Sequence, residues 1–154
     1  MDYIHNHQSG IQSGGKNNEI TCNMIYNNQG NGIRLEGYHF GIITLNNITG
    51  NDGIGLLLTY NYDFRDNVIT GKRNKILYNN IYNNAIDAFF EFNYLTRWDQ
   101  NYWGIDSEKP YIISGRTSFL KNIYIPKSII PWINIDWHPA TEPFDIPNPE
   151  VRIE

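Results

Sequence analysis

The sequence predicts an all-β protein: a right-handed, single-stranded parallel β-helix of about four coils, with three strands per coil. The first observation is a repeat, because the pattern Asn-x-Ile-x-x-Asn returns after one coil length along the chain. The second is composition, since the 154 residues include 24 Ile and 22 Asn. Isoleucine favours strands, whereas asparagine favours turns and accepts left-handed backbone. Many short strands and many turns, repeated regularly, are typical of a solenoid.

The repeat fixes which residues should stack. Its frame positions Asp2, Asn23, Asn46 and Asn79 lie 21, 23 and 33 residues apart, so the last interval contains about ten extra residues. Equivalent residues of successive coils then lie about 4.8 Å apart. We expect asparagines at the corners, hydrogen bonded from coil to coil as in other stacked amides. Three interior isoleucine columns are predicted: Ile4–Ile25–Ile48–Ile81, Ile20–Ile43–Ile76 and Ile11–Ile33–Ile54–Ile86.

The two ends of the predicted solenoid differ. Residues 1–104 form the β-helix, and Trp98, Tyr102 and Trp103 should close it as an aromatic C-terminal cap. Residues 105–154 carry all seven prolines, which predicts an irregular tail packed on the β-helix, held there by Trp132 and Trp137.

At the other end the repeat starts within a coil, which would leave an open strand edge. We expect further coils or a partner to cover this edge. The alternative is that residues 1–16 fold over as an irregular cap.

Charge and composition narrow the possible partners and compartments. The net charge of −4 and the pI near 5.5 argue against nucleic-acid binding. A single cysteine excludes an internal disulfide, and no apolar run reaches the roughly 18–20 residues of a membrane span. No signal peptide is visible in the chain. We expect an extracytoplasmic or cell-surface location as part of a longer precursor.

The coils Asn18–Asn28 and Asn74–Asn84, the Gly32-Ile33-Arg34-Leu35 stretch and the terminal Asn101-Tyr102-Trp103-Gly104 resemble the right-handed β-helix repeat family. That family includes NosD-type copper-accessory proteins and carbohydrate-binding and sugar-hydrolase repeat domains, often on archaeal and bacterial surfaces. The resemblance covers about residues 1–104. It implies the fold and leaves the activity open.

The sequence offers no catalytic or metal constellation, and it implies no cofactor. The outward acidic positions Glu36 and Asp87 lie about two coils apart and unmatched, whereas calcium needs several oxygen ligands together. His5 and His7 lack the spacing of a zinc motif, and the Met, Cys and His clusters that copper favours are missing. Cys22 is expected to be buried.

The candidate ligand-binding site is the insertion of about residues 57–73, because insertions in solenoids gather on a binding face. Aromatic rings beside hydrogen-bonding charges suit sugar rings, and the alternative is that these aromatics pack the loop onto the coil. The candidate residues are the insertion's Tyr60, Tyr62, Asp63, Phe64 and Arg65, with the outward-facing Arg34 and Glu36.

Three functions remain open from the sequence. The leading one is a non-catalytic surface or exported module that binds polysaccharide or cell-surface glycan, or serves as a scaffold. The enzyme alternative is a polysaccharide lyase or glycoside hydrolase with its site partly on further coils. The metal alternative is a NosD-type copper-accessory protein.

Overall fold

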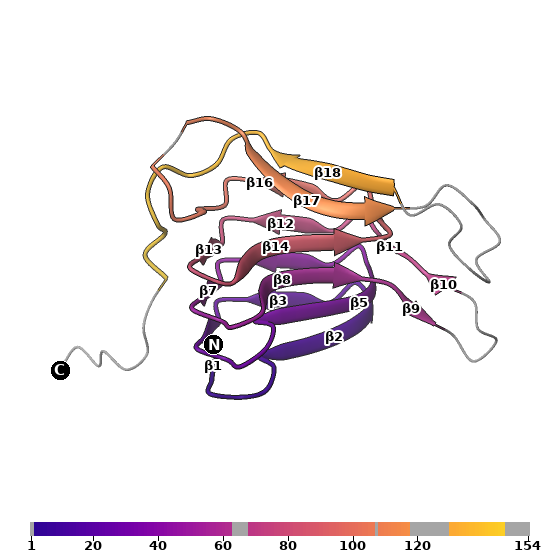
Figure 1. Ribbon diagram of the computed structural model, residues 1–154, viewed down its shortest axis with the longest axis horizontal. Helices are drawn as coiled ribbons and strands as arrows, with labels where there is room; N and C mark the ends of the chain where they lie inside the picture. Colours follow the sequence, from indigo (N-terminus) through magenta and orange to yellow (C-terminus); the bar gives the residue numbers. More distant parts are fainter. Residues whose placement is uncertain (1, 63–67, 107, 118–129, 147–154) are drawn as a thin grey trace.

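The structure, a computed structural model, describes residues 2–62, 68–106, 108–117 and 130–146. Within these ranges the chain forms eighteen strands and no helix. The strands wind into three parallel walls, and each turn of the winding stacks on the one before it (Figure 1). The all-β parallel solenoid predicted from the repeat is confirmed.

Each wall collects one strand from each coil. The first wall contains β1 (Tyr3–His5), β4 (Met24–Tyr26), β7 (Asn47–Thr49) and β13 (Asn80–Tyr82). The second wall contains β3 (Glu19–Thr21), β6 (Ile42–Thr44), β12 (Lys75–Leu77) and β16 (Arg97–Asp99). The main wall contains β2 (Ile11–Lys16), β5 (Ile33–His39), β8 (Ile54–Thr59), β14 (Ile86–Glu91) and β17 (Tyr111–Thr117).

Five further strands lie at the edges of these walls. The short hairpin of β9 (Asn61–Tyr62) and β10 (Val68–Ile69) projects from the edge of the main wall (Figure 1). Strand β11 (Gly71–Lys72) returns to pair with β5 and with β15 (Asn93–Tyr94). Strand β18 (Ile130–Asp136) runs antiparallel to β17 and also pairs with β16, so it joins the main wall to the second wall.

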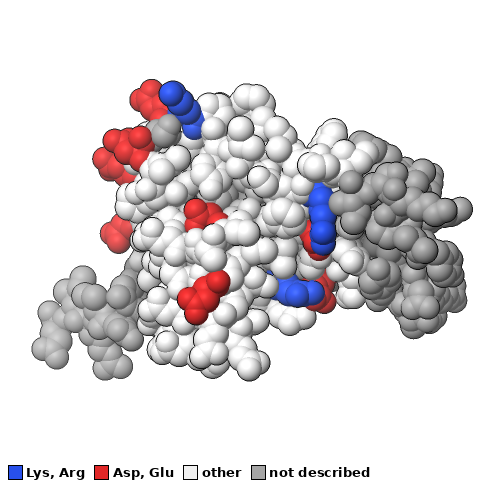
Figure 2. All heavy atoms as spheres, viewed as in Figure 1, with Lys and Arg blue, Asp and Glu red and all other residues white. Residues whose placement is uncertain are grey.

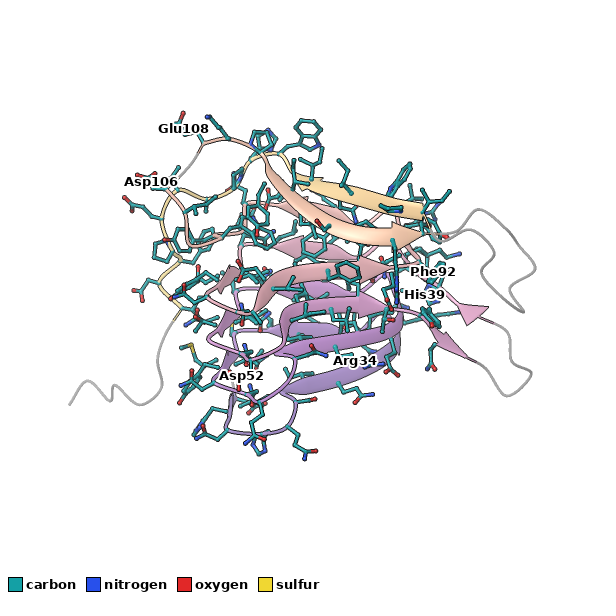
Figure 3. All side chains as sticks on the ribbon, in the orientation of Figure 1. Arg34, His39, Asp52, Phe92, Asp106 and Glu108 are labelled. Atoms are coloured by element: carbon teal, nitrogen blue, oxygen red, sulfur yellow. The ribbon has the colours of Figure 1, made fainter. Side chains whose placement is uncertain are left out.

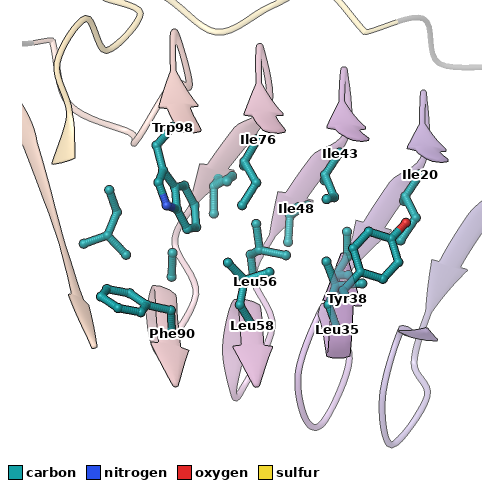
Figure 4. Packing of buried hydrophobic residues seen from close by; sticks show 14 of the residues in the cluster. Ile20, Leu35, Tyr38, Ile43, Ile48, Leu56, Leu58, Ile76, Phe90 and Trp98 are labelled. Carbon is teal, nitrogen blue, oxygen red and sulfur yellow. The ribbon is translucent and has the colours of Figure 1, made fainter. Parts of the chain in front are cut away.

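Two of the three predicted interior columns are confirmed. In the first wall Ile4, Ile25, Ile48 and Ile81 are direct partners across successive strands. In the second wall Ile20, Ile43 and Ile76 stack in the same way, and Trp98 follows them at the end (Figure 4). Apart from Ile4 at the N-terminal edge, these side chains are at most 7% exposed. Burying each one contributes about 1.5–3 kcal/mol.

The predicted third column is wrong from its third residue onwards. Ile11 stacks on Ile33, but Ile33 stacks on Leu56 and Leu56 on Ala88. Ile54 and Ile86 pair with each other, but each lies two residues before the interior position of its strand, and Ile86 is 51% exposed. The register follows the distance from the corner asparagine: Ile33 and Leu56 are each five residues beyond Asn28 and Asn51. The recurring dipeptide Gly-Ile had suggested that Ile54 aligns with Ile33.

The corners bend through single residues with left-handed backbone. One column of such residues contains Cys22, Leu45, Tyr78 and Gln100, with φ between 54° and 58°. Each is followed by a buried asparagine of the repeat. The side chain of a left-handed residue points away from the core here, so Leu45 and Tyr78 are 38% and 40% exposed. Cys22 is half-buried in this outer column, so the expectation of a buried cysteine is wrong.

The corner asparagines form a hydrogen-bonded ladder, as predicted. The Nδ2 of Asn23 donates to Oδ1 of Asn46 at 3.0 Å, Asn46 to Asn79 at 3.0 Å and Asn79 to Asn101 at 3.0 Å. The backbone N–H of each residue also donates to that oxygen of the next coil. These amides are buried, so the bonds replace the water that each polar group loses. A second ladder runs through Asn28, Asn51 and Asn84.

Both ladders end on an aspartate. Every amide points its NH2 group towards the C-terminal coil, so the last asparagine needs an acceptor that does not donate in turn. Asp136 accepts from Nδ2 of Asn101 at 3.0 Å, and Asp87 accepts from Nδ2 of Asn84 at 3.2 Å. Burial raises the pKa of Asp87, and the hydrogen bonds from Asn84 oppose that shift. A carboxylate at the positive end of aligned dipoles is electrostatically favourable.

The aromatic cap predicted at the end of the repeat is confirmed for Trp98 and Trp103, whereas Tyr102 lies outside the core. Trp98 and Trp103 are each 3% exposed, with ring centroids 6.0 Å apart. Trp103 also stacks on Tyr111 at 4.1 Å, with the two rings nearly parallel. Tyr102 packs edge-on against Tyr82 at the outer surface. The rings therefore fill the mouth of the core and fix the start of β17 above it.

The described part of the tail takes two forms. Residues 111–117 and 130–136 are the paired strands β17 and β18 at the end of the solenoid. Residues 138–146 then run down the outside of the coils (Figure 1), where Phe144 and Asn80 exchange two hydrogen bonds. Trp132 and Trp137 are 48% and 61% exposed, and hydrogen bonds of Asp136 and Phe144 attach this part of the chain to the coils.

Candidate functional site

The outer face of the main wall carries two ion pairs. On β5, Arg34 donates from Nε to Oε1 of Glu36 at 2.7 Å, and Gln12 of β2 donates to the same oxygen at 3.1 Å. Figure 2 shows two such blue and red pairs on this face, with mostly uncharged surface around them. Arg34 is less buried than its partner, with side-chain exposures of 43% and 21%. The carboxylate of Glu36 is thus held in one position.

The second pair lies further along the same face. Glu91 at the end of β14 is ion-paired with Arg116 of β17, and it accepts a hydrogen bond of 2.7 Å from the hydroxyl of Thr59. Thr59 pairs with Glu36 in the strand ladder. The two carboxylates therefore lie in one row across β5, β8 and β14, separated by a single strand. Two strand spacings correspond to about 9.6 Å.

A pocket of about 260 Å³ opens at the edge of this face, between the strand ends and β9. Its lining combines backbone at two glycines with polar or ionisable side chains from three strands. Figure 3 shows His39 at this edge, close to Phe92 and beside the projecting hairpin. The lining residues are Gly15, Lys16, Glu36, Gly37, His39 and Asn61.

The pocket forms at a β-bulge, where β5 has one residue more than β2 between two paired positions. Gly15 of β2 has φ of 98° and Gly37 of β5 has φ of 55°, and each lies four residues after an interior isoleucine, Ile11 or Ile33. The register between β2 and β5 shifts at Gly15. Left-handed backbone favours glycine, and a bulge re-aims the side chains that follow it. The bulge and the two left-handed glycines leave glycine backbone in the pocket wall and bring Lys16 and His39 to its rim.

A row of three cation-forming side chains lies beside the pocket, and two of them, Lys16 and His39, line it. Lys16 pairs with His39, and His39 pairs with Lys72, so one such residue comes from each of β2, β5 and β11. Among the described residues, the buried Nδ1 of His39 has no hydrogen-bond partner. Burial, then Lys72 and Lys16, lower the pKa of His39. The imidazole is therefore held neutral near pH 7 between two permanent positive charges.

The predicted site residues separate into three groups. Arg34 and Glu36 lie together beside the pocket, and Glu36 lines it. Tyr60 packs edge-on against Phe92 at 5.1 Å, which is the loop-packing role weighed as the alternative. Tyr62 lies in β9 next to Asn61. Asp63, Phe64 and Arg65 lie outside the described residues.

Sequence reasoning missed the pocket residues Lys16, His39 and Asn61. The signal that could have revealed them is the equal spacing of Gly15 and Gly37 from the interior isoleucines, which predicts left-handed glycines side by side in adjacent strands. The position of Lys72 could not be predicted from the sequence, because about ten inserted residues separate it from the regular repeat. Only the return of β11 to β5 places it beside His39.

A family model described as "Periplasmic copper-binding protein (NosD)" matches residues 3–123. The chain belongs to the NosD family. This confirms the resemblance drawn from the repeat and accords with the right-handed parallel β-helix of that family. The periplasmic description of the NosD family is consistent with an extracytoplasmic chain. No curated protein and no solved structure gives a significant match.

Among the described residues of this NosD-family chain, the donors that copper favours do not form a cluster. Copper favours clustered Met, Cys and His ligands. Where the structure describes the chain, no three His, Cys, Asp or Glu residues come together. His5 stacks on Tyr26, His138 bonds to Asp99 at 3.0 Å and Cys22 lies in the outer corner column, so these donors are dispersed.

The described ranges also contain no helix long and apolar enough to cross a membrane.

Proposed function

We propose that this chain is a non-catalytic, exported β-helix module that binds glycan on the outer face of its main wall. The observation that carries this proposal is the pocket of about 260 Å³ beside β9, where polar side chains from three strands come together next to the bulge of β5. Its volume lies just below the roughly 300–1,000 Å³ of pockets for drug-sized ligands. That size suits one small polar unit, such as a single sugar of a longer chain.

The hydrogen-bonding groups around the pocket support binding. Lys16, Glu36, His39 and Asn61 offer both donors and acceptors, which sugar hydroxyls require. Beyond the pocket, the paired charges of Arg34 and Glu36 continue along the face. A glycan lying across the strands would meet these fixed polar groups in succession.

The arrangement of carboxylates favours binding over hydrolysis. Glu36 and Glu91 lie about two strand spacings apart, near the separation of the two carboxyl groups in inverting glycosidases. Each of them accepts hydrogen bonds and is held by an arginine. A general acid must instead carry a proton to the leaving group. The enzyme function therefore stays the alternative.

Filling the pocket tests the proposal. With a glycan array used to select a ligand, Asn61→Trp is expected to weaken binding by at least about tenfold, since the indole would occupy the pocket; tenfold corresponds to about 1.4 kcal/mol. The matched control is Asp52→Trp, an exposed position at the opposite edge (Figure 3). Equal binding by both variants would contradict the assigned site, and no glycan binding by folded wild-type protein would favour a scaffold. Release of reducing sugar or unsaturated uronide would support the enzyme.

We also propose that the N-terminal edge is covered in the functional protein, by further coils or by a partner. Strand β1 pairs with β4 on one side, and no described strand pairs with its other side. Unpaired strand edges are exposed templates for further strands. Hydrogen exchange should show fast exchange in β1 and slow exchange in β7 of the isolated chain. Protection of β1 that grows with protein concentration would identify a second copy as the cover.

A further inference from the structure

We infer that the pocket beside β9 is an anion site, and that the glycan bound there is acidic, with a carboxylate placed against Lys16, His39 and Lys72. The inference rests on the proposed function and adds the chemical class of the ligand. It is carried by the stacking of three cation-forming side chains, one per strand: Lys16 and His39 line the pocket, and Lys72 is the strand partner of His39.

The local charge balance favours an anion. Lys16 and Lys72 flank His39 from the neighbouring strands, whereas Glu36 is the one carboxylate that lines the described pocket. Oε1 of Glu36 already accepts from Arg34 and Gln12. Among the described lining residues, no second carboxylate balances the charge of Lys16 and of the neighbouring Lys72. This surplus contrasts with the whole chain, whose net charge is −4.

His39 makes this site sensitive to pH. The groups that face it are Lys16 on β2, Lys72 on β11, Glu36 on its own strand and Asn61 on β9. Desolvation and the two lysines lower its pKa, so it is neutral near pH 7. A carboxylate bound beside it favours the charged imidazolium and raises that pKa. Binding therefore takes up a proton, and affinity must increase as the pH falls through the His39 pKa.

The test compares two ligands that differ only in charge. Oligogalacturonate and its fully methyl-esterified counterpart are titrated into the full chain by calorimetry at pH 5.5 and pH 8. At pH 5.5 the acidic ligand is expected to bind about tenfold more tightly than the methyl-esterified ligand, which is the gain expected from two partly exposed ion pairs. At pH 8 the acidic ligand should bind more weakly than at pH 5.5. The His39 imidazole resonance should titrate at higher pH when the acidic ligand is present.

Variants separate the contributions of the lysines and the histidine. Lys16→Ala/Lys72→Ala is expected to remove the preference for the acidic ligand, and His39→Gln to remove its pH dependence. Lys75→Ala is the matched control, because Lys75 is an exposed lysine on the second wall. Equal affinity for both ligands, or equal loss in the Lys75 variant, would overturn the inference.

The two proposals can fail separately. If neither oligosaccharide binds but galacturonate or inorganic phosphate still raises the His39 pKa, the anion site stands and glycan binding fails. If only the methyl-esterified ligand binds, glycan binding stands and the anion site fails.

Discussion

Replacing Asp136 with alanine is expected to lower the free energy of unfolding by about 3–5 kcal/mol, because a buried acceptor shared by several neutral donors is lost. The side chain is fully buried and receives five hydrogen bonds. Oδ2 accepts from the backbone and side chain of Asn101 and from Nε1 of Trp103. Oδ1 accepts from the backbone N–H groups of Gln100 and His138. Alanine would leave these donors unsatisfied, each at about 1–3 kcal/mol if water cannot reach it.

Urea denaturation followed by tryptophan fluorescence measures this loss. Asp136→Asn should cost about half as much, because its single oxygen can keep the Oδ2 partners while its NH2 group faces the donors at Oδ1. Asp106→Ala is the control, since Asp106 is exposed near the same end of the molecule (Figure 3). A loss below about 1 kcal/mol for Asp136→Ala would show that the ladder does not need this acceptor.

Replacing Ile48 with alanine is expected to cost about 2–5 kcal/mol, the range for such truncations in packed cores. Ile48 is fully buried and lies between Ile25 and Ile81 in the first interior column. A cavity there removes contacts to both neighbouring coils. The backbone around it cannot collapse easily, because the ladders on either side fix the coil spacing.

Ile86 provides a matched control for this substitution. It is also a strand isoleucine, but it is 51% exposed, so Ile86→Ala should cost less than about 1 kcal/mol. Both values come from the same thermal or urea denaturation experiment. Similar losses in the two variants would contradict the assignment of Ile48 to the core. Such a result would favour Ile86 facing inward, as the sequence alignment alone had suggested.

The sequence predicts the solenoid well because its signals are local and repeated. The columns through Ile48 and Ile43 follow directly from counting residues between corner asparagines. The third column could not be aligned by appearance, because Gly32-Ile33 and Gly53-Ile54 look equivalent but lie at different distances from their corners. Cys22 was misjudged for a related reason. Its place in a column was correct, but the left-handed backbone that turns the column outward has no distinct sequence signature.

The candidate site was harder to predict from the sequence, because it depends on strand pairing between residues far apart in the chain. Arg34 and Glu36 could be placed on the outer face from strand alternation alone. His39 lies beyond the bulge at Gly37, where simple alternation fails. Its neighbour Lys72 arrives from beyond an insertion, so no spacing in the chain predicts their contact.

The directional ladders also have a consequence for how such a chain can evolve. Each interior coil presents acceptors to the preceding coil and donors to the following one, as Asn46 and Asn79 do. Duplication of one such unit in the gene would therefore lengthen the tube without disturbing either terminus. Asp136 would then accept the last hydrogen bonds one coil further along the axis, and a solenoid of any length could end in the same way.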